Sequence, residues 1–342
     1  MDIYRLLKLN NAIKSHRIKF FGLWILNIFN KRYLSIQFDP VLACNLRCTM
    51  CYFSDSEFVK KNMKGIFKEE EIEKIAAVNF KNALKLQIGC GAEPTLFKHN
   101  TALIKTAKLY KVPYISMITN GNLLTEQDVE NFSNAGLNEF VFSMHGVNKS
   151  SYEKFMEKGD FEKFNTALRY VSTEKIKNKN LKLRINYTFN EDNFDELNNF
   201  FDNFNHLEID TIQLRPIDKI GESSYNNFNL SMIENQYDAL LEFFKAECQT
   251  RKIMLLAPDS IKRNEIESFV VESQNNSSYL LPYTYCYVSP NYFWKDNFEW
   301  KTQGFSDWKK QNGWHSELFF NIFKSRKHFD EPNRNMLNYG LS

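Results

Sequence analysis

The sequence lacks a long apolar run, a strong excess of one charge, and any stretch that resembles a secretion signal. Its main apolar stretch, residues 20–29, is only ten residues long and is interrupted by Asn27, whereas a bilayer-spanning helix needs about 20 apolar residues. Lys and Arg number 44 against 41 Asp and Glu in 342 residues. A surface so nearly balanced in charge gives no reason to expect a nucleic-acid partner.

A disulfide framework is also absent, because the six cysteines are unevenly spaced. Three of them crowd into eight residues and three lie far from each other; the positions are Cys44, Cys48, Cys51, Cys90, Cys248 and Cys286. Such spacing favours a metal site in a reducing compartment over a disulfide-rich secreted fold. We therefore expect a cytoplasmic protein that uses some of its cysteines as ligands.

Basic residues flank the apolar stretch near the N-terminus, at positions 14, 17, 19, 31 and 32. A segment of this kind usually packs as a helix against the body of a soluble protein. The alternative is a peripheral contact with a membrane surface through residues 14–32, with the apolar face lying in the interface. We treat residues 1–33 as a helical, basic and apolar extension.

Residues 34–230 alternate between short apolar strands and amphipathic helices. Strands are expected at 35–39, 84–88, 112–119, 139–143, 182–189 and 211–214, with helices at 69–80, 97–110, 125–136, 148–158, 161–177 and 193–205. Six such units predict parallel strands with right-handed helical crossovers, fewer than the eight units of a closed barrel. The expected fold class is therefore α/β, a partial (β/α)6 TIM-like barrel.

The alternation is lost after residue 230, where a long helix over 232–250 leads into a tail rich in aromatic residues. Residues 231–342 are therefore expected to form a small α+β C-terminal unit.

The strongest motif is C-x3-C-x2-C, formed by Cys44, Cys48 and Cys51 just beyond the first expected strand. Three thiolates on a tight loop suit an iron–sulfur cluster or zinc. Structural zinc nearly always takes four protein ligands, and His99 is the first downstream candidate for a fourth. Three cysteines therefore favour a cubane cluster with one iron left open.

The motif resembles the cluster loop of the radical S-adenosylmethionine (SAM) enzymes, although Met50 replaces the usual aromatic residue before the third cysteine. Further similar segments follow the next strands in the order typical of that family; they are Gly91-Ala92-Glu93-Pro94, Thr119-Asn120-Gly121 and Ser143-Met144-His145-Gly146. The resemblance assigns SAM contacts to Gly91, Glu93 and Ser143. His145 departs from the usual aspartate and is either a cofactor contact or a structural residue.

Three more polar residues, Arg184, Asn186 and Arg215, are expected to point toward the same mouth if strand alternation holds. They are either binders of carboxylate and hydroxyl groups or members of buried ion pairs.

The resemblance implies the cofactors and the chemistry of the site. In this family the cluster is a [4Fe-4S] cube whose open iron binds SAM, and a reductant such as flavodoxin or ferredoxin supplies one electron. The resulting 5′-deoxyadenosyl radical removes a hydrogen atom from the substrate, while the protein orients the reactants and excludes solvent.

The C-terminal residues bear a weaker resemblance to the SPASM or twitch extension, through residues 285–291 and 321–340. After subtraction of the three motif cysteines, only Cys90, Cys248 and Cys286 remain, one fewer than an auxiliary cluster normally needs. We expect a degenerate extension without such a cluster. Cys286 is either a buried apolar residue or a hydrogen-atom donor, as in radical SAM peptide epimerases.

Two substrate classes remain open at this stage. The SPASM-like remnant favours a peptide, but a leader-recognition module of about 80 residues has no room before residue 34. A carbohydrate-like or other small polar metabolite is the alternative, with deoxygenation, dehydrogenation or epimerisation as the reaction. The second functional class is a non-catalytic barrel that binds zinc or a partner protein.

Overall fold

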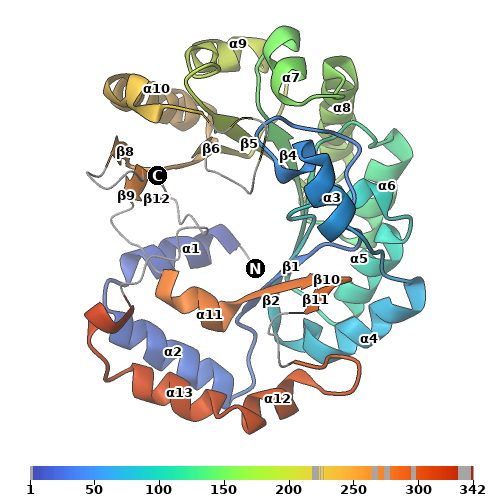
Figure 1. Cartoon of the computed structure of the whole chain (residues 1–342), viewed down its shortest axis with the longest axis vertical. Coiled ribbons are helices and arrows are strands. Elements are labelled where there is room, and N and C mark those ends of the chain that lie inside the picture. The colour runs from blue at the N-terminus through green and yellow to red at the C-terminus, as the bar shows by residue number, and fades with distance from the viewer. Residues whose placement is uncertain are drawn as a thin grey trace.

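The computed structural model describes residues 3–217, 223, 225, 227–263, 269–272, 278–293, 298–329 and 340–341. A curved sheet of ten strands forms its frame. From edge to edge the strands are β11 (Tyr292–Phe293), β10 (Tyr285–Ser289), β1 (Leu34–Phe38), β2 (Ala83–Ile88), β3 (Tyr114–Thr119), β4 (Glu139–Met144), β5 (Lys182–Phe189), β6 (Thr211–Pro216), β7 (Met254–Ala257) and β12 (Gly340–Leu341) (Figure 1). The six strands expected from the sequence are confirmed as neighbours in chain order.

Helices cover the outer face of the curved sheet (Figure 1). They are α4 (Glu69–Asn79), α5 (Asn100–Leu109), α6 (Glu126–Ala135), α7 (Lys149–Phe155), α8 (Phe161–Lys177), α9 (Phe200–Asn203) and α10 (Glu234–Arg251), while α3 (Ser56–Asn62) follows the cysteine loop. The helix expected over 193–205 is instead a 3-10 turn, Asp195–Asn199, continued by the short α9. The six strand–helix units form the expected partial barrel.

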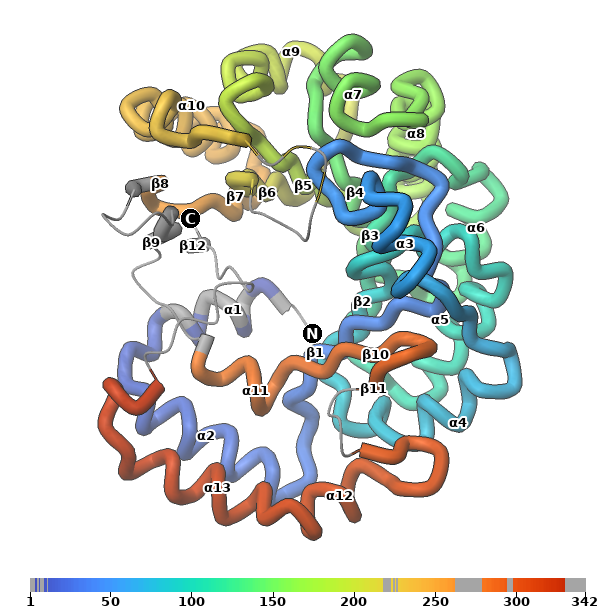
Figure 2. Tube along the Cα trace, in the orientation of Figure 1, coloured from blue at the N-terminus to red at the C-terminus, as the bar shows by residue number. Residues whose placement is uncertain are grey.

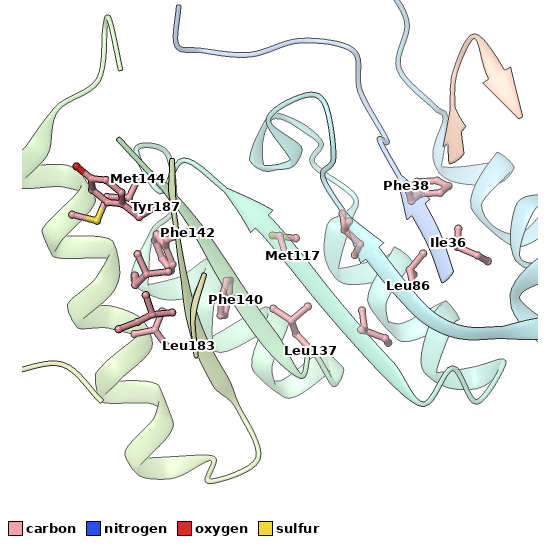
Figure 3. Packing of buried hydrophobic residues seen from close by; sticks show 14 of the residues in the cluster. Ile36, Phe38, Leu86, Met117, Leu137, Phe140, Phe142, Met144, Leu183 and Tyr187 are labelled. Atoms are coloured by element: carbon pink, nitrogen blue, oxygen red, sulfur yellow. The ribbon is translucent and has the colours of Figure 1, made fainter. Parts of the chain in front are cut away.

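Strand alternation separates an apolar outer face of the sheet from a polar inner face. Ile36 and Phe38 on β1 point toward the helices and are fully buried, as are Leu86, Phe140 and Leu183 on other strands (Figure 3). The intervening positions face the barrel interior and are largely polar; they include Ser35, Gln37, Lys85, Gln87, Glu139, Ser143, Arg184, Asn186, Thr188, Gln213 and Arg215. The outer face supplies the core, and the inner face is available for binding.

The residues after 230 contribute to the same sheet at both of its ends. β7 pairs parallel with β6, and β10 pairs parallel with β1. The antiparallel strands β11 and β12 cover the two edges, and β8 (Ser260–Arg263) pairs with β9 (Phe269–Glu272) as a separate hairpin. The parallel sheet is therefore wider than the six expected strands, and the division of the chain at residue 230 stays a prediction. Residues 330–339, within the SPASM-like segment, lie outside the described residues.

The N-terminal extension forms two helices, α1 (Ile3–Ala12) and α2 (His16–Ile28). Tyr4 of α1 is buried in the barrel, where its ring packs edge-on against Tyr114 with centroids 6.3 Å apart. In Figure 2, α1 lies between the two edges of the sheet, and α2 lies beside α13 (Trp314–Asn321). Of the described helices, not one combines the length and apolar character needed to cross a membrane.

The short helices α11 (Leu281–Thr284) and α12 (Phe305–Gln311) complete the C-terminal region. Phe20 of α2 is fully buried, and its ring contacts those of Tyr279, Tyr283 and Phe329. The side of α2 that carries Phe20 therefore packs against the protein body, whereas Ile18, Phe21 and Ile28 on its other side are exposed.

Candidate active site

The motif cysteines lie on the loop that leaves β1 at its carboxyl end. The backbone N–H groups of Arg47 and Thr49 donate to the carbonyls of Glu157 and Phe155, each at 2.9 Å. The Arg47 guanidinium also donates to the Cys44 carbonyl at 2.9 Å. The loop is therefore fastened to the end of α7 and to itself by its own residues.

A cavity of about 230 Å³ lies beside this loop, at the end of the strands where parallel barrels carry their active sites. Ten of the predicted site residues line it; they are Cys44, Cys48, Cys51, Gly91, Glu93, Thr119, Asn120, Ser143, His145 and Arg215. These residues come from the ends of five strands and the loops that follow them. The fold thus brings together motifs that are up to 170 residues apart in the sequence.

The arrangement of the three thiols suits a multi-iron cluster. Burial raises the pKa of the Cys44 thiol to about 12, and burial also raises the pKa of Cys48 and Cys51. Metal binding at these residues must therefore displace protons. Within the described part of the chain, no three His, Cys, Asp or Glu side chains gather as ligands of a single ion. The thiols instead surround a cavity, as a cluster with a different iron for each cysteine requires.

Asp39, directly after β1, holds the loop that follows β2. Its carboxylate accepts hydrogen bonds from the backbone N–H groups of Cys90 at 2.7 Å and Gly91 at 2.9 Å, and from the Tyr287 hydroxyl at 2.8 Å. The Tyr52 hydroxyl donates to the Gly91 carbonyl. A Cβ at Gly91 would lie 2.5 Å from that hydroxyl, so glycine permits this close approach. One carboxylate therefore connects β1, the loop after β2 and the C-terminal strand β10.

Glu93 lines the cavity, and its carboxylate also holds the neighbouring loops in place. Its carboxylate accepts hydrogen bonds from the Thr95 N–H and hydroxyl at 3.1 and 2.6 Å, the Thr119 hydroxyl at 2.8 Å, and the Asn120 N–H at 2.8 Å. Glu93 is only 3% exposed. These bonds fix the loop after β2 to the end of β3, where Asn120 donates to Asn45 on the cysteine loop at 2.9 Å.

The wall opposite the cysteine loop carries Ser143, His145, Thr188 and Arg215. Burial and the nearby positive charge of Arg215 lower the pKa of His145 to about 4, so its imidazole is neutral at neutral pH. The buried His145 Nδ1 has no hydrogen-bond partner among the described residues. His145 thus lines the cavity as a neutral imidazole, while its Nδ1 is itself buried and unpartnered among the described residues.

Arg184 does not line the cavity, and of the two roles left open by the sequence its contacts match the buried ion pair. Its Nη2 donates to the Glu139 carboxylate at 2.8 Å and to the Tyr4 hydroxyl at 2.7 Å. At about 3.3 Å per residue, Arg184 is about 13 Å nearer the start of β5 than Thr188, which does line the cavity. Asn186 faces the interior between these two levels, beside Ser143 of β4.

Cys286 also points away from the cavity. In the parallel pairing of β1 with β10 it is the partner of Ile36, on the outer face of the sheet, and Asn79 of α4 donates to its sulfur at 3.7 Å. A fully buried thiol on that face matches the alternative of a buried apolar residue, and a hydrogen-donor role for Cys286 stays a prediction. Cys90 is the cysteine outside the motif that lines the cavity.

Sequence reasoning missed several residues that shape the site. Asp39 and Tyr52 flank the cysteine motif, so their position next to it was a usable signal. Tyr287 and Thr188 gave no local signal, because their place depends on the pairing of β10 with β1 and on the height of a residue along β5.

Comparison with known proteins supports the assignment that the motifs indicate. Residues 40–203 match the sequence profile of the Radical SAM superfamily. A probable GTP 3′,8-cyclase of Methanocaldococcus jannaschii is 26% identical over 210 residues, which cover 61% of this chain and 67% of the relative. A GTP 3′,8-cyclase of Clostridium botulinum strain Hall is 28% identical over 193 residues, or 56% of this chain and 59% of the relative.

Solved structures share the fold. Streptococcus suis SuiB superposes with a TM-score of 0.57 at 18% identity, covering 78% of this chain and 61% of SuiB. The protein anSMEcpe with bound SAM gives a TM-score of 0.52 at 19% identity, covering 65% of this chain and 60% of the other. This chain thus spans about three fifths of the structures that it matches.

The Radical SAM match over residues 40–203, just under half of the chain, supports its assignment to the radical SAM superfamily. Members of this superfamily use a [4Fe-4S] cluster and SAM. The partial α/β barrel, the three cysteines after β1 and the cavity beside them agree with that assignment.

Proposed function

We propose that the protein is a radical SAM enzyme in which Cys44, Cys48 and Cys51 hold a [4Fe-4S] cluster and the adjoining cavity binds SAM. The observation that carries the proposal is the convergence of all three thiols and the loops after β2, β3 and β4 on one cavity. The cofactors, when bound, supply reductive cleavage of SAM to a 5′-deoxyadenosyl radical that removes a hydrogen atom from the substrate. A one-electron donor of the flavodoxin or ferredoxin type is the proposed redox partner.

The chain's own residues have distinct roles in this proposal. Asp39 and Glu93 act as positioning residues, because their carboxylates hold the loop of Gly91 and the end of β3 through short hydrogen bonds. Ser143 and the neutral His145 lie on the opposite wall, where they are placed to hydrogen-bond the cofactor or substrate. Their partly buried position also limits the access of water to the reacting atoms.

A small polar metabolite is the substrate class that we favour. The cavity wall carries polar side chains, among them Asn120, Thr188 and Arg215, beside apolar ones such as Met50 and Ile118. Further polar side chains on the inner face, Gln37, Lys85 and Gln87, lie outside the cavity lining. Such a surface suits a carbohydrate-like or nucleotide-like molecule with many hydrogen-bonding groups. The relatives named GTP 3′,8-cyclase carry the name of a polar metabolite of this type.

A peptide is the second candidate, because the fold is shared with SuiB, which has been solved bound to the precursor peptide SuiA. Its side chain would enter the same cavity. A deuterated substrate of each class separates the two, since the true substrate transfers deuterium to 5′-deoxyadenosine.

The proposal is tested by anaerobic reconstitution with iron and sulfide, followed by SAM and dithionite. We expect about four irons and four sulfides per chain and release of 5′-deoxyadenosine. Substitution of Ala at Cys44, Cys48 or Cys51 should abolish both. Cys248→Ala is the matched control, because Cys248 is buried on α10 away from the cavity and should leave both readouts unchanged.

The competing function is a non-catalytic barrel that binds zinc or a partner protein. One tightly bound zinc per chain, with no iron uptake and no 5′-deoxyadenosine, would establish that alternative. Retained SAM cleavage in a Cys48→Ala variant would also contradict the proposed role of the motif.

A further inference from the structure

Two neighbouring helices, α2 and α13, expose an apolar surface on the outside of the molecule. The two helices run antiparallel. His16 at the start of α2 contacts the carbonyl of Lys324, which follows α13, at 3.0 Å. Lys309, which precedes α13, donates to Asn27 near the end of α2 at 2.9 Å. Both helices lie at the outer edge of the molecule, on the far side of α11 from the sheet (Figures 1 and 2).

The exposed side of this helix pair is largely aromatic. We define the α2–α13 face by Ile18, Phe21, Trp24, Ile28, Phe319 and Phe323. Phe21 is 50% exposed and Phe323 is 65% exposed. The rings are contiguous. The ring centroid of Trp24 lies 6.0 Å from that of Phe21 and 5.2 Å from that of Phe319, and the centroids of Phe319 and Phe323 are 5.3 Å apart.

Helix α2 carries apolar side chains on its outward side as well as on its buried side. Phe20 and Leu23 pack into the protein, whereas Ile18, Phe21 and Ile28 project outward at helical spacing. Arg17 lies among these outward side chains, so the outward side of α2 combines apolar residues with a cation. Apolar side chains with this degree of exposure, gathered on one surface, are typical of a docking site.

The same surface has a positively charged end. Residues 3–38 contain no Asp or Glu but seven Lys and Arg. Lys14 precedes α2 and Arg17 lies in its first turn, and the neighbouring His16 contacts the backbone carbonyl of Lys324, which follows α13. The positive charges of Arg326 and Lys14, added to the larger effect of burial, lower the pKa of Lys19 to about 8. Several cations are thus crowded at one end of the face.

We propose that the α2–α13 face docks on an anionic lipid bilayer surface, with the aromatic and aliphatic side chains in the interface and the basic end against the headgroups. Charge selects this occupant. An isologous contact with a second copy would bring two basic surfaces together, whereas anionic headgroups complement Lys14, Arg17 and Lys324. Short helices with an apolar face and flanking basic residues bind membranes in this way without spanning them.

The test is co-sedimentation of the full chain with vesicles of phosphatidylcholine, with and without about 30% phosphatidylserine. We expect binding to the anionic vesicles, with at least about tenfold weaker binding to neutral ones. The double variant Phe21→Ser/Phe323→Ser should reduce anionic binding by about tenfold or more, because both side chains are exposed and their loss does not disturb the core.

The matched control is Leu109→Ser/Ile176→Ser, which removes two exposed apolar side chains, 77% and 66% exposed, from α5 and α8. It should bind vesicles like the unaltered chain. Raising the salt concentration should weaken binding, and Lys14→Gln/Arg17→Gln should reduce the preference for anionic lipid.

Three outcomes would overturn the proposal. They are no binding to anionic vesicles, binding that survives Phe21→Ser/Phe323→Ser unchanged, and a dimer that this variant dissociates while the unaltered chain ignores vesicles. The last outcome would assign the face to a second copy. Each measurement is independent of SAM cleavage, so it stands apart from the proposed enzymatic function.

Discussion

At the residue scale, the polar inner face of the sheet contains two different kinds of charged side chain. Arg215 lies on the cavity wall, whereas Arg184 is deep in the barrel and paired with Glu139, which is fully buried. Although burial opposes its charge, Arg184 and Lys85 hold the pKa of Glu139 below its ordinary value. The ion pair joins β4 to β5, and its contact with Tyr4 joins both strands to α1.

A substitution separates this structural role from a role in binding SAM. Arg184→Met should lower the free energy of unfolding by about 3–5 kcal/mol, because it leaves the Glu139 carboxylate buried without its cation. The double variant Glu139→Gln/Arg184→Met should recover part of that loss. Urea unfolding measures both changes. SAM affinity of the reconstituted, folded variant should stay unchanged, and a selective loss of SAM binding without loss of stability would contradict this account.

The sequence could predict the side of the sheet for Arg184 but not its height. Side-chain alternation has a period of two residues, so Arg184 and Asn186 face the interior, as expected, and Thr188 faces it as well. Height along the strand depends on where the barrel mouth begins, which is set by the register of neighbouring strands. The three motif cysteines were easier to place, because their spacing and their position directly after β1 are local features.

At the scale of elements, the path of the loop that follows β2 depends on the backbone conformation of its first residue. Gly89 has φ of +79°, a left-handed conformation that residues with a side chain rarely adopt. A Cβ there would lie 2.5 Å from the Ile118 carbonyl oxygen and 2.7 Å from the Pro94 ring. The loop that carries Gly91 and Glu93 therefore turns at a point that excludes side chains.

Gly89→Ala should destabilise the protein by more than the backbone conformation alone costs, which is about 1–2 kcal/mol. The additional steric contact with backbone should also displace the loop and weaken SAM binding. Gly313→Ala is the matched control, because Gly313 has φ of +62° and a Cβ added there would meet no other atom within 4 Å. Urea unfolding and SAM binding measure the two effects. Equal stability losses for the two variants would contradict the steric argument.

The elements themselves could largely be predicted from hydrophobic periodicity. The expected strand over 182–189 coincides with β5, and the helix that Thr125 begins is confirmed as α6, where the Thr125 hydroxyl accepts from the Asp128 N–H at 3.1 Å. The helix predicted over the weakly periodic segment 193–205 differs most from the structure, which has a 3-10 turn followed by a single α-helical turn there. Local patterns define elements well where one face is continuously apolar.

At the scale of the whole molecule, residues after 230 extend the barrel sheet on both sides. β10 pairs with β1 across about 250 residues of sequence, and β7 extends the sheet beyond β6. Tyr287 of β10 donates to Asp39 at the site itself. No periodic pattern in a single segment encodes such long-range pairing, so the sequence could not predict that residues after 230 add strands to the same sheet.

This sharing makes a prediction about a fragment of residues 1–230, which the proposed division of the chain would treat as an intact barrel with its N-terminal extension. The fragment exposes both edges of the sheet, because β1 loses β10 and β6 loses β7. Phe20 of α2 also loses the rings of Tyr279 and Tyr283, whose centroids lie 5.7 and 5.6 Å from its own. We therefore expect the fragment to aggregate or to unfold without a cooperative urea transition, while the full chain unfolds cooperatively. Light scattering and circular dichroism in urea measure the difference. A soluble fragment with a sharp transition and a functional cluster site would instead establish the barrel as an independent domain.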